Sequence, residues 1–473
     1  MRRTRLVIIG AGTAGLTALK EAQRYTEDVI LINDGPLGTT CARVGCMPSK
    51  ALLAVAHGLD QRGFLADAGV AGTEDLRVDL PRVLAHVRDL RDQFIAGPIK
   101  AFESLGAQSI AGRPRFLDAN TLEVGGERIE TAATVIATGS SPIVPGPWQA
   151  FGDRVLTSDT VFEQPDLGAR VAVIGLGAIG CELGQGLAQL GLTVHGFNRG
   201  TQLAGLSDPD VSEAMAVALG RHMRVHTGAD AEVSESPDGA LTVSAGDSAV
   251  EVDWVLAALG RRPNLRELGL ESLPGAMKSS GEPDLDGQTL RLGELPVYIA
   301  GDVNGIRPLM HEAADQGRVA AYHALNPEAE CLARRAPVAI VFTEPNGARV
   351  GAAFKDLPAD VIRGEADFGK QPRALMAGRN AGRLHVYADA AEGRLLGAEM
   401  AVPDGEHLAH MLAWVIQQDL TLDDVLQLPF YHPVTAEGLR AALQHARRQL
   451  GQGRTMPDLP LCHEAADWAL GGD

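Results

Sequence analysis

The chain has few cysteines and no long apolar run. Its 473 residues include 5 Cys, at positions 41, 46, 181, 331 and 462. They are too few and too scattered for a secreted disulfide framework. No Cys/His cluster has the spacing of zinc ligands, so we predict no metal site. No run of 18 apolar residues is present, and the apolar run 6–9 stops at Gly10, too early for a signal peptide. These absences predict a cytoplasmic protein that does not enter a membrane.

Basic charge is also scarce. The chain carries 42 Lys and Arg against 60 Asp and Glu, a net charge of −18. Such a surface repels phosphate backbones and anionic lipids, which argues against nucleic acid or a membrane as partner. The negative net charge is instead consistent with a protein that binds small molecules. At about 150 residues per domain, the length allows roughly three domains.

Two of the five cysteines, Cys41 and Cys46, lie five positions apart. On a regular helix their Cα atoms would be roughly 8–9 Å apart, whereas a disulfide requires less than about 7 Å. A bridge can close only if the turn is distorted, and Gly45, Pro48 and the helix-start signal Thr39-Thr40 supply the means. Strained bridges of this kind are readily reduced, so we predict a redox-active dithiol rather than two unrelated core thiols.

A glycine-rich loop of the form GxGxxG occurs twice. Gly10, Gly12 and Gly15 follow one apolar strand, and Gly175, Gly177 and Gly180 follow another. Each loop leads into a helical pattern and then a second buried strand, which predicts two βαβ units. In such units glycines let the backbone approach a pyrophosphate at the helix N-terminus. One loop is weak evidence, but two in this context predict two dinucleotide sites.

Two further apolar strands end in glycine, one before Thr138-Gly139 and one before Gly301-Asp302. After about residue 337 strand-like segments at 338–342, 384–387 and 395–398 precede helical segments 405–418 and 421–428. This pattern favours an α+β domain with a mostly antiparallel sheet. Near its end His432 precedes a proline, and Glu437 follows five positions later. The last part of the chain, from 449, is rich in Gly and Pro and is expected to be a loosely held tail.

Taken in this order, the motifs resemble those of the class I pyridine nucleotide-disulfide oxidoreductases. The segment VGCMPSK, 44–50, is most similar to that of dihydrolipoyl dehydrogenase, with the glutathione reductases close behind. The resemblance implies an α/β fold with two Rossmann-like dinucleotide-binding domains and a C-terminal α+β dimerisation domain. The predicted boundaries are FAD-binding 1–150, NAD(P)-binding 151–265, a second FAD-binding part 266–336, dimerisation 337–450 and a tail 451–473.

The resemblance also implies roles for individual residues. FAD belongs at the first loop, and NAD or NADP at the second. Cys46 would face the flavin, Cys41 would meet the substrate, and His432, oriented by Glu437, would act as base from the other subunit of a homodimer. Lys50 and Glu182 match an ion pair beside the flavin. The remaining cofactor-binding residues implied are Gly10, Gly12, Gly15, Thr138, Gly139, Asp302, Gly175, Gly177, Gly180 and Gly260.

The chain departs from the family pattern where an acidic residue usually binds the adenosine ribose. The first unit has Asn33 followed by Asp34, either of which could serve FAD. The second has Asn198 followed by Arg199, so the carboxylate that would repel a 2′-phosphate is missing. We hypothesise that NADP(H) is accepted; the alternative is that Arg199 simply faces solvent. Near the base, Tyr431 and Val434 replace the family's usual Ala and Thr, which leaves the identity of the disulfide open.

Several functions remain in competition. The leading one is a dihydrolipoyl dehydrogenase acting on a small-molecule or lipoyl-type disulfide, with membership of a multienzyme complex left open. The second is an NAD(P)H-dependent reductase of another disulfide, a quinone or a metal ion. Mercuric reductases and large thioredoxin reductases carry a C-terminal Cys pair, whereas this tail has only Cys462. Soluble transhydrogenases lack the counterpart of Cys46. The remaining alternative is not an enzyme: the protein could be a flavoprotein scaffold without redox chemistry.

Overall fold

The computed structural model describes residues 1–237, 239–450 and 458–459. Most of the predicted tail 451–473, including Cys462, lies outside the described residues. The chain forms two compact units, and each draws on separate stretches of sequence. Unit 1 comprises 1–52, 79–167 and 259–334, and unit 2 comprises 53–78, 168–258 and 335–473.

Unit 1 is built around a mixed sheet in the order β3-β2-β1-β6-β5-β4, with β17 paired to β6. Strands β1, β2, β3, β6 and β17 run parallel, while β4 and β5 are antiparallel additions. The bounds of these strands are β1 Arg2–Ile9, β2 Val29–Asn33, β3 Ser109–Ala111, β4 Arg115–Asp118, β5 Thr121–Val124, β6 Glu127–Ile136 and β17 Val297–Ile299. A two-stranded ribbon joins β7 Ser140–Pro142 to β16 Arg261–Pro263.

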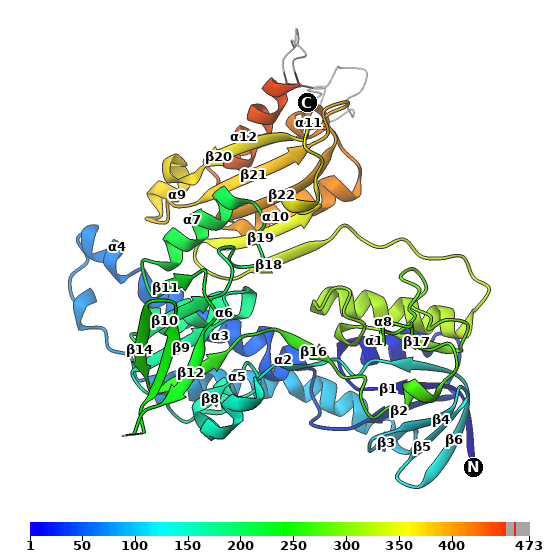
Figure 1. The fold of residues 1–473 in the computed structure, drawn as a ribbon. Helices are drawn as coiled ribbons and strands as arrows, with labels where there is room; N and C mark the ends of the chain where they lie inside the picture. The colour runs from blue at the N-terminus through cyan, green and yellow to red at the C-terminus, as the bar shows by residue number, and fades with distance from the viewer. Residues whose placement is uncertain (238, 451–457, 460–473) are drawn as a thin grey trace. The chain divides into compact units, whose positions relative to one another are not determined.

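Helices α1 and α8 lie side by side against this sheet (Figure 1). Their contact is close because Gly317 of α8 faces the backbone of Ala14, where a Cβ would overlap the carbonyl oxygen. Buried alanines at the same interface, such as Ala18 and Ala320, also allow the close approach. The helices of unit 1 are α1 Thr13–Ala22, α2 Thr40–Val44, α5 Leu80–Glu103 and α8 Met310–Leu325; α3 Cys46–Asp60 begins in it.

Unit 2 contains a second parallel sheet, whose strands follow the order β11-β10-β9-β15. Residues 171–174 of β9 are all buried, as expected for a parallel strand covered on both faces. The bounds are β9 Arg170–Ile174, α6 Ala178–Gln189, β10 Thr193–Asn198, α7 Pro209–Leu219, β11 Arg224–Thr227 and β15 Trp254–Ala257. An antiparallel sheet inserted between β11 and β15 comprises β12 Glu232–Glu235, β13 Leu241–Ala245 and β14 Ser248–Val252. Helix α4 Arg62–Asp67 also belongs to this unit.

The C-terminal part of unit 2 is an antiparallel sheet, as the sequence predicts, and its strands follow the order β18-β19-β22-β21-β20. Helices α10 and α12 pack on this sheet. The sequence analysis missed α12, which follows the His-Pro segment. The bounds are β18 Val338–Val341, β19 Asn346–Gly351, β20 Ile362–Asp367, α9 Pro372–Met376, β21 Arg383–Ala388, β22 Leu395–Val402, α10 Gly405–Gln417, α11 Leu422–Leu426 and α12 Ala436–Gln449. The two βαβ units and the antiparallel sheet confirm the predicted fold class.

Side-chain alternation gives the C-terminal sheet two different faces. Leu384 and Val386 of β21 join the apolar core with α10 and α12. His385 and Tyr387 point to the opposite face because successive side chains of a strand alternate. There they meet Asp208, the residue that caps α7. A polar cluster of buried side chains therefore joins α7 to this sheet within unit 2.

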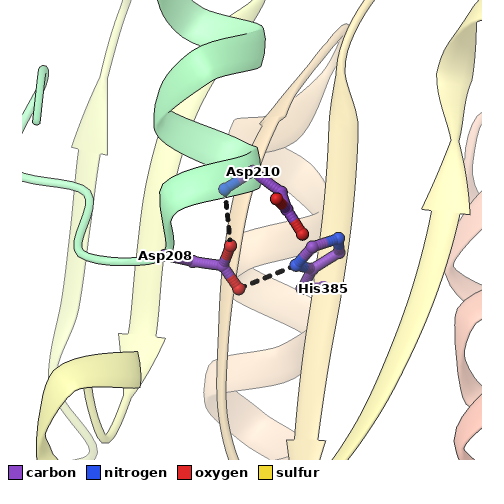
Figure 2. A group of neighbouring side chains, drawn as sticks. All are labelled: Asp208, Asp210 and His385. Atoms are coloured by element: carbon purple, nitrogen blue, oxygen red, sulfur yellow. Dashed lines mark hydrogen bonds and ion pairs between the residues drawn. The ribbon is translucent and has the colours of Figure 1, made fainter.

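Asp208 is the centre of that cluster (Figure 2). One carboxylate oxygen accepts hydrogen bonds from the backbone N–H groups of Asp210, at 3.0 Å, and Val211, at 3.4 Å. The other oxygen lies 2.7 Å from Nδ1 of His385 and accepts the hydroxyl of Tyr387 at 2.8 Å. Burial acts to raise the pKa of Asp208, but these hydrogen bonds outweigh it and hold the pKa below its usual value.

We expect Asp208→Asn to lower the free energy of unfolding by about 1–3 kcal/mol, because an amide has only one acceptor atom and cannot accept both the pair His385 and Tyr387 and the backbone N–H groups of Asp210 and Val211. A carboxyl whose pKa is lowered by folding stabilises the protein above its unfolded pKa of about 4, and the contribution is lost as pH falls through the folded value. The stability difference between wild type and variant should therefore be full at pH 6 and shrink below about pH 4. Urea unfolding across this range measures it.

Asp210→Asn is the matched control. Its carboxylate is half exposed and pairs with Arg363 at 3.1 Å, so the cost should stay below about 1 kcal/mol. An equal cost for both variants, or a cost for Asp208→Asn that does not change with pH, would contradict the role given to the Asp208 carboxylate.

Candidate active site and cofactor cradles

The thiols of Cys41 and Cys46 are neighbours in the structure, and no disulfide joins them. Thr39 caps α2 by accepting the N–H of Ala42 at 3.2 Å, so the predicted helix start holds. Gly45 then breaks the helix with φ −119° and ψ −116°, and α3 begins at Cys46. This break brings together two thiols that a continuous helix would separate.

The two thiols have different electrostatic surroundings. Cys46 is the first residue of α3, where free N–H groups and the helix dipole favour a thiolate. The pKa of Cys41 is raised, first by its hydrogen bond with Cys46, then by burial and by the charge of Cys46. The ammonium of Lys50 acts in the opposite direction. Cys46 is thus suited to carry the charge while Cys41 keeps the proton.

The first glycine loop has the shape of a phosphate cradle. Gly10 has φ +107°, and a Cβ there would overlap the carbonyl of Ala137. A Cβ on Gly15 would overlap the carbonyl of Gly10, so only glycine lets α1 approach the strand. Nothing lies within 4 Å of the Cβ position of Gly12. The N-terminus of α1 has no side-chain cap and no acidic residue in its first turn, which leaves its N–H groups for an anion.

The second loop repeats this geometry in unit 2. Gly175 has φ +95°, Gly177 is open, and a Cβ on Gly180 would overlap the carbonyl of Gly175. Helix α6 likewise begins without a side-chain cap or an acidic first turn. Both loops therefore fit a dinucleotide pyrophosphate, as the residue pattern of FAD and NAD(P) sites requires.

Asn33 and Asn198 brace the two loops from the ends of β2 and β10. The amide oxygen of Asn33 accepts the N–H of Ala11 at 2.9 Å, and that of Asn198 accepts the N–H of Leu176 at 3.0 Å. Their amide NH₂ groups donate to the carbonyls of Gly35 and Gly200. Each asparagine lies 23 positions after the first glycine of its loop, a repeat that the sequence analysis did not use. Each amide oxygen already accepts a hydrogen bond from its loop, and these bonds stabilise the loop conformation.

The residues next to these asparagines differ in their partners. Asp34 pairs with Arg113, which also pairs with Glu267. The side chain of Arg199 is 82% exposed, and its nearest carboxylate, Asp230, is 3.9 Å away and equally open to solvent. Such a pair is weak. Arg199 is thus available to a ligand, whereas Asp34 is held in an ion pair.

The predicted FAD-site residues outside the glycine loop gather in unit 1. Thr138 donates its hydroxyl to the carbonyl of Asn264 at 2.7 Å, and Asn264 returns a hydrogen bond to Thr138 at 3.0 Å. Gly139 has φ +67°. Asp302 accepts the hydroxyl of Ser140 at 2.9 Å. Asn264 and Ser140 support this site without having given a signal in the sequence.

Gly260 belongs to the same unit and also has a positive φ, of +91°. Its carbonyl accepts the N–H of Ile143 at 3.0 Å, which ties the segment before β16 to the segment after β7.

His432 and Glu437 form a hydrogen-bonded pair at the start of α12. Nδ1 of His432 lies 2.9 Å from a carboxylate oxygen of Glu437, whose other oxygen accepts the N–H of Val434 at 3.2 Å. The hydrogen bond with His432 is the first cause that lowers the pKa of Glu437. A carboxylate acceptor requires a proton on Nδ1, so Nε2 is left to exchange protons. The ring is 75% exposed.

The other predicted residues have separate surroundings. Glu182 is buried in unit 2 and accepts the N–H of Phe342 at 2.9 Å. Lys50 belongs to unit 1, and its pairing with Glu182 stays a prediction. Burial raises the pKa of Cys181 to about 12, so this thiol is not ionised near neutral pH. Among the described residues, no helix is long and apolar enough to traverse a bilayer.

One group of side chains with metal-type ligand atoms occurs in the described part of the chain, formed by Asp208, Asp210 and His385. The oxygens of Asp208 already accept four hydrogen bonds, and Asp210 pairs with Arg363. These partners make the group a hydrogen-bonding network, and we assign no metal to it.

Comparison with known proteins agrees with the geometry. The family model of pyridine nucleotide-disulphide oxidoreductases matches residues 4–317, and the model of their dimerisation domain matches 337–443. The chain therefore belongs to the pyridine nucleotide-disulphide oxidoreductases, enzymes that use FAD and NAD(P). The dimerisation domain supports a homodimer.

Similar proteins span nearly the whole chain. It is 30% identical to a dihydrolipoyl dehydrogenase of Halobacterium salinarum, over 94% of this chain and 96% of the relative. It is also 30% identical to a mercuric reductase of Staphylococcus aureus, over 92% of this chain and 81% of the relative. The solved HOCl-induced flavoprotein disulfide reductase RclA from Escherichia coli, as its Cu(II) complex, has the same fold, with a TM-score of 0.81, 22% identity and coverage of 94% and 99%.

We expect the reactivity of Cys41 to depend on Cys46. In the reduced wild-type protein Cys41 should alkylate slowly with iodoacetamide at pH 7, because its pKa is raised. Cys46→Ala removes both the hydrogen bond and the charge of Cys46, so Cys41 should alkylate several-fold faster and at lower pH. Peptide mass spectrometry measures each site separately. The exposed Cys331 is the internal reference, and an unchanged Cys41 rate relative to it would refute the coupling.

Proposed function

We propose that the protein oxidises a lipoyl-type dithiol, or reduces the corresponding disulfide, through the Cys41–Cys46 pair. The observation that carries this proposal is the adjacency of the two thiols at a helix break, with Cys46 at the start of α3. The similarity to dihydrolipoyl dehydrogenases over nearly the full chain supports the substrate class. The predicted domain boundaries are kept as part of the proposal.

The exchange chemistry needs only side chains of the protein. His432 takes a proton from a substrate thiol at Nε2, and the thiolate attacks the sulfur of Cys41 in the oxidised pair. Cys46 leaves as a thiolate. The second substrate thiol then attacks the mixed disulfide, so the substrate leaves as a disulfide and both cysteines are reduced. FAD, when bound, supplies two-electron transfer between this dithiol and the nicotinamide.

The residues around this chemistry act in supporting roles. Glu437 holds His432 in the tautomer with Nδ1 protonated. Gly10, Gly12 and Gly15, with Thr138, Gly139 and Asp302, would hold FAD. Because the family forms dimers through this domain, we propose that His432 of each subunit serves the cysteine pair of the other. A cytoplasmic location is part of the proposal, supported by cysteines too few and scattered for a secreted disulfide framework. Service in a multienzyme complex is left open.

The test is anaerobic oxidation of dihydrolipoamide by the purified FAD-loaded protein. We expect turnover in the wild type, none in Cys41→Ser, and a rate roughly 10²–10⁴-fold lower in His432→Gln, which cannot take the proton. Reduction of the bound flavin by NADH or NADPH should be unaffected in both variants, which serves as the control. Undiminished turnover in His432→Gln would overturn the role of the base.

A second candidate is the reduction of another disulfide, a quinone or a metal ion. The chain is as similar to a mercuric reductase as to a dihydrolipoyl dehydrogenase, at 30% identity each, which supports this second candidate. Tyr431, which replaces the usual Ala beside His432 and is 80% exposed, also supports it. Flavin reduction by a nicotinamide without dihydrolipoamide turnover would favour this candidate. Loss of all redox chemistry in a folded, FAD-loaded protein would instead favour the scaffold alternative.

We further propose that NADP(H) is accepted at the second loop. The amide of Asn198 brings no negative charge to the end of β10, and Arg199 next to it is open to solvent. A guanidinium suits the 2′-phosphate. If Arg199 instead only faces solvent, its replacement should not change the kinetics with NADPH.

Arg199→Ala should lower kcat/KM for NADPH by roughly 10–100-fold, the loss of one charge-assisted contact, and leave kcat/KM for NADH unchanged. Steady-state kinetics with both nucleotides measure the ratio. Arg221→Ala, an exposed arginine elsewhere in the same unit, should change neither. Parallel losses with NADH and NADPH, or no loss with either, would count against recognition of the 2′-phosphate.

A further inference from the structure

Arg261, the first residue of β16, carries a largely buried guanidinium in unit 1, with 16% of the side chain exposed. Nη1 donates to the hydroxyl of Ser158 at 3.0 Å and to the carboxylate of Asp159 at 2.9 Å. Nε donates to Oγ of Ser140 at 2.9 Å, and Nη2 donates to the carbonyl of the same residue at 2.7 Å. Arg261 therefore binds Ser140 at two atoms, while the ion pair with Asp159 balances its charge.

The hydrogen bond from Arg261 fixes the direction of the Ser140 hydroxyl. Because an arginine N–H group can only donate, Oγ of Ser140 must accept it. The single proton of the hydroxyl is then left to donate, and Oδ2 of Asp302 lies 2.9 Å away as its acceptor. A guanidinium, a hydroxyl and a carboxylate thus form one directed chain, in which the cation strengthens the hydrogen bond to the carboxylate.

Asp302, the end of this chain, lies beside the first dinucleotide cradle. The Cβ position of the preceding residue, Gly301, is 3.0 Å from the Cβ of Ala14 in the first turn of α1. The N–H of Gly301 donates to Oε1 of Gln316 at 2.7 Å, which fixes the backbone before Asp302. Within the described residues, Oδ1 of Asp302 accepts no hydrogen bond. The orientation of the Asp302 side chain is therefore set by Ser140, and one oxygen is left for a ligand in the cradle.

We propose that Arg261 is a positioning residue of the FAD site, which acts through Ser140 to aim the carboxylate of Asp302 at a hydroxyl group of FAD. A carboxylate oxygen accepts a hydroxyl proton, and the cation at the far end of the chain holds that oxygen in place. The inference rests on the proposed function, which assigns Asp302 to FAD. The alternative is that Arg261 only stabilises the ribbon of β7 and β16, and the two roles predict different results.

The test measures the dissociation constant of FAD by diluting the holoenzyme and following the fluorescence of released flavin. Ser140→Ala removes the link and keeps both charged ends, whereas Arg261→Met removes the donor. We expect each to raise the Kd for FAD by roughly 10–100-fold, the loss of a hydrogen bond to a charged group. Ser140→Thr keeps the hydroxyl and should retain the wild-type Kd. Arg262→Met, at the exposed next position of β16, is the matched control and should also retain it.

A double-variant cycle separates positioning from general stabilisation. If Arg261 acts through Asp302, Arg261→Met should not raise the Kd further in an Asp302→Ala background, whereas independent contributions would add. The visible circular dichroism of the bound flavin should change in the same way in Ser140→Ala and Arg261→Met, because both release the same carboxylate. Far-UV circular dichroism checks that each variant is folded. If Arg261→Met does not fold, the comparison of Ser140→Ala with Ser140→Thr decides.

The outcomes distinguish this inference from the proposed function. Additive losses, or a wild-type Kd in Ser140→Ala, would overturn the positioning role of Arg261 and leave Asp302 as a residue of the FAD site. A wild-type Kd in Asp302→Ala would overturn both the inference and the place that the proposed function gives to Asp302. These measurements use no disulfide substrate, so a failure of dihydrolipoamide turnover would reject the substrate without affecting the result for Arg261.

Discussion

The packing of glycine against a carbonyl oxygen is the contact on which both cofactor cradles depend. Gly15 and Gly180 each face the carbonyl of the first glycine in their own loop, at a separation that no Cβ could share. The helix can therefore begin directly at the strand end, and its free N–H groups point to one place. Because the contact occurs in both units, the same steric constraint prepares two sites for two dinucleotides.

A second local constraint makes the dithiol. Without the break at Gly45, a helix through Cys41 and Cys46 would hold the thiols too far apart to exchange a bond. The break also makes Cys46 the first residue of α3. The same local feature therefore brings the two thiols together and gives them different electrostatic surroundings. Geometry and reactivity in this segment have one cause, which is why so short a motif carries so much functional information.

The sequence predicts features whose partners lie nearby along the chain. The glycine loops, their strands and helices, and the antiparallel C-terminal sheet follow from periodicity and turn residues, and they are found in the structure. Contacts between distant residues gave no such signal. Asn264 reaches Thr138 across 126 positions, and His385 reaches Asp208 across 177. Nothing local distinguishes these residues from ordinary polar ones, and only the fold selects their partners. Helix α12 did have a local signal, because Leu439, Ala442, Leu443 and Ala446 follow the spacing of one helical face, and the sequence analysis did not use it.

Helix α12 positions the base from within the domain core that it helps to build. Its first turn presents Glu437 to His432, and its buried stripe with Leu439 and Leu443 packs on the C-terminal sheet. Since helical side chains four positions apart share a face, Leu439 and Leu443 together anchor the helix on the sheet. The carboxylate that orients His432 is therefore held by a helix fixed in the core, and the position of the base follows from the packing of the domain.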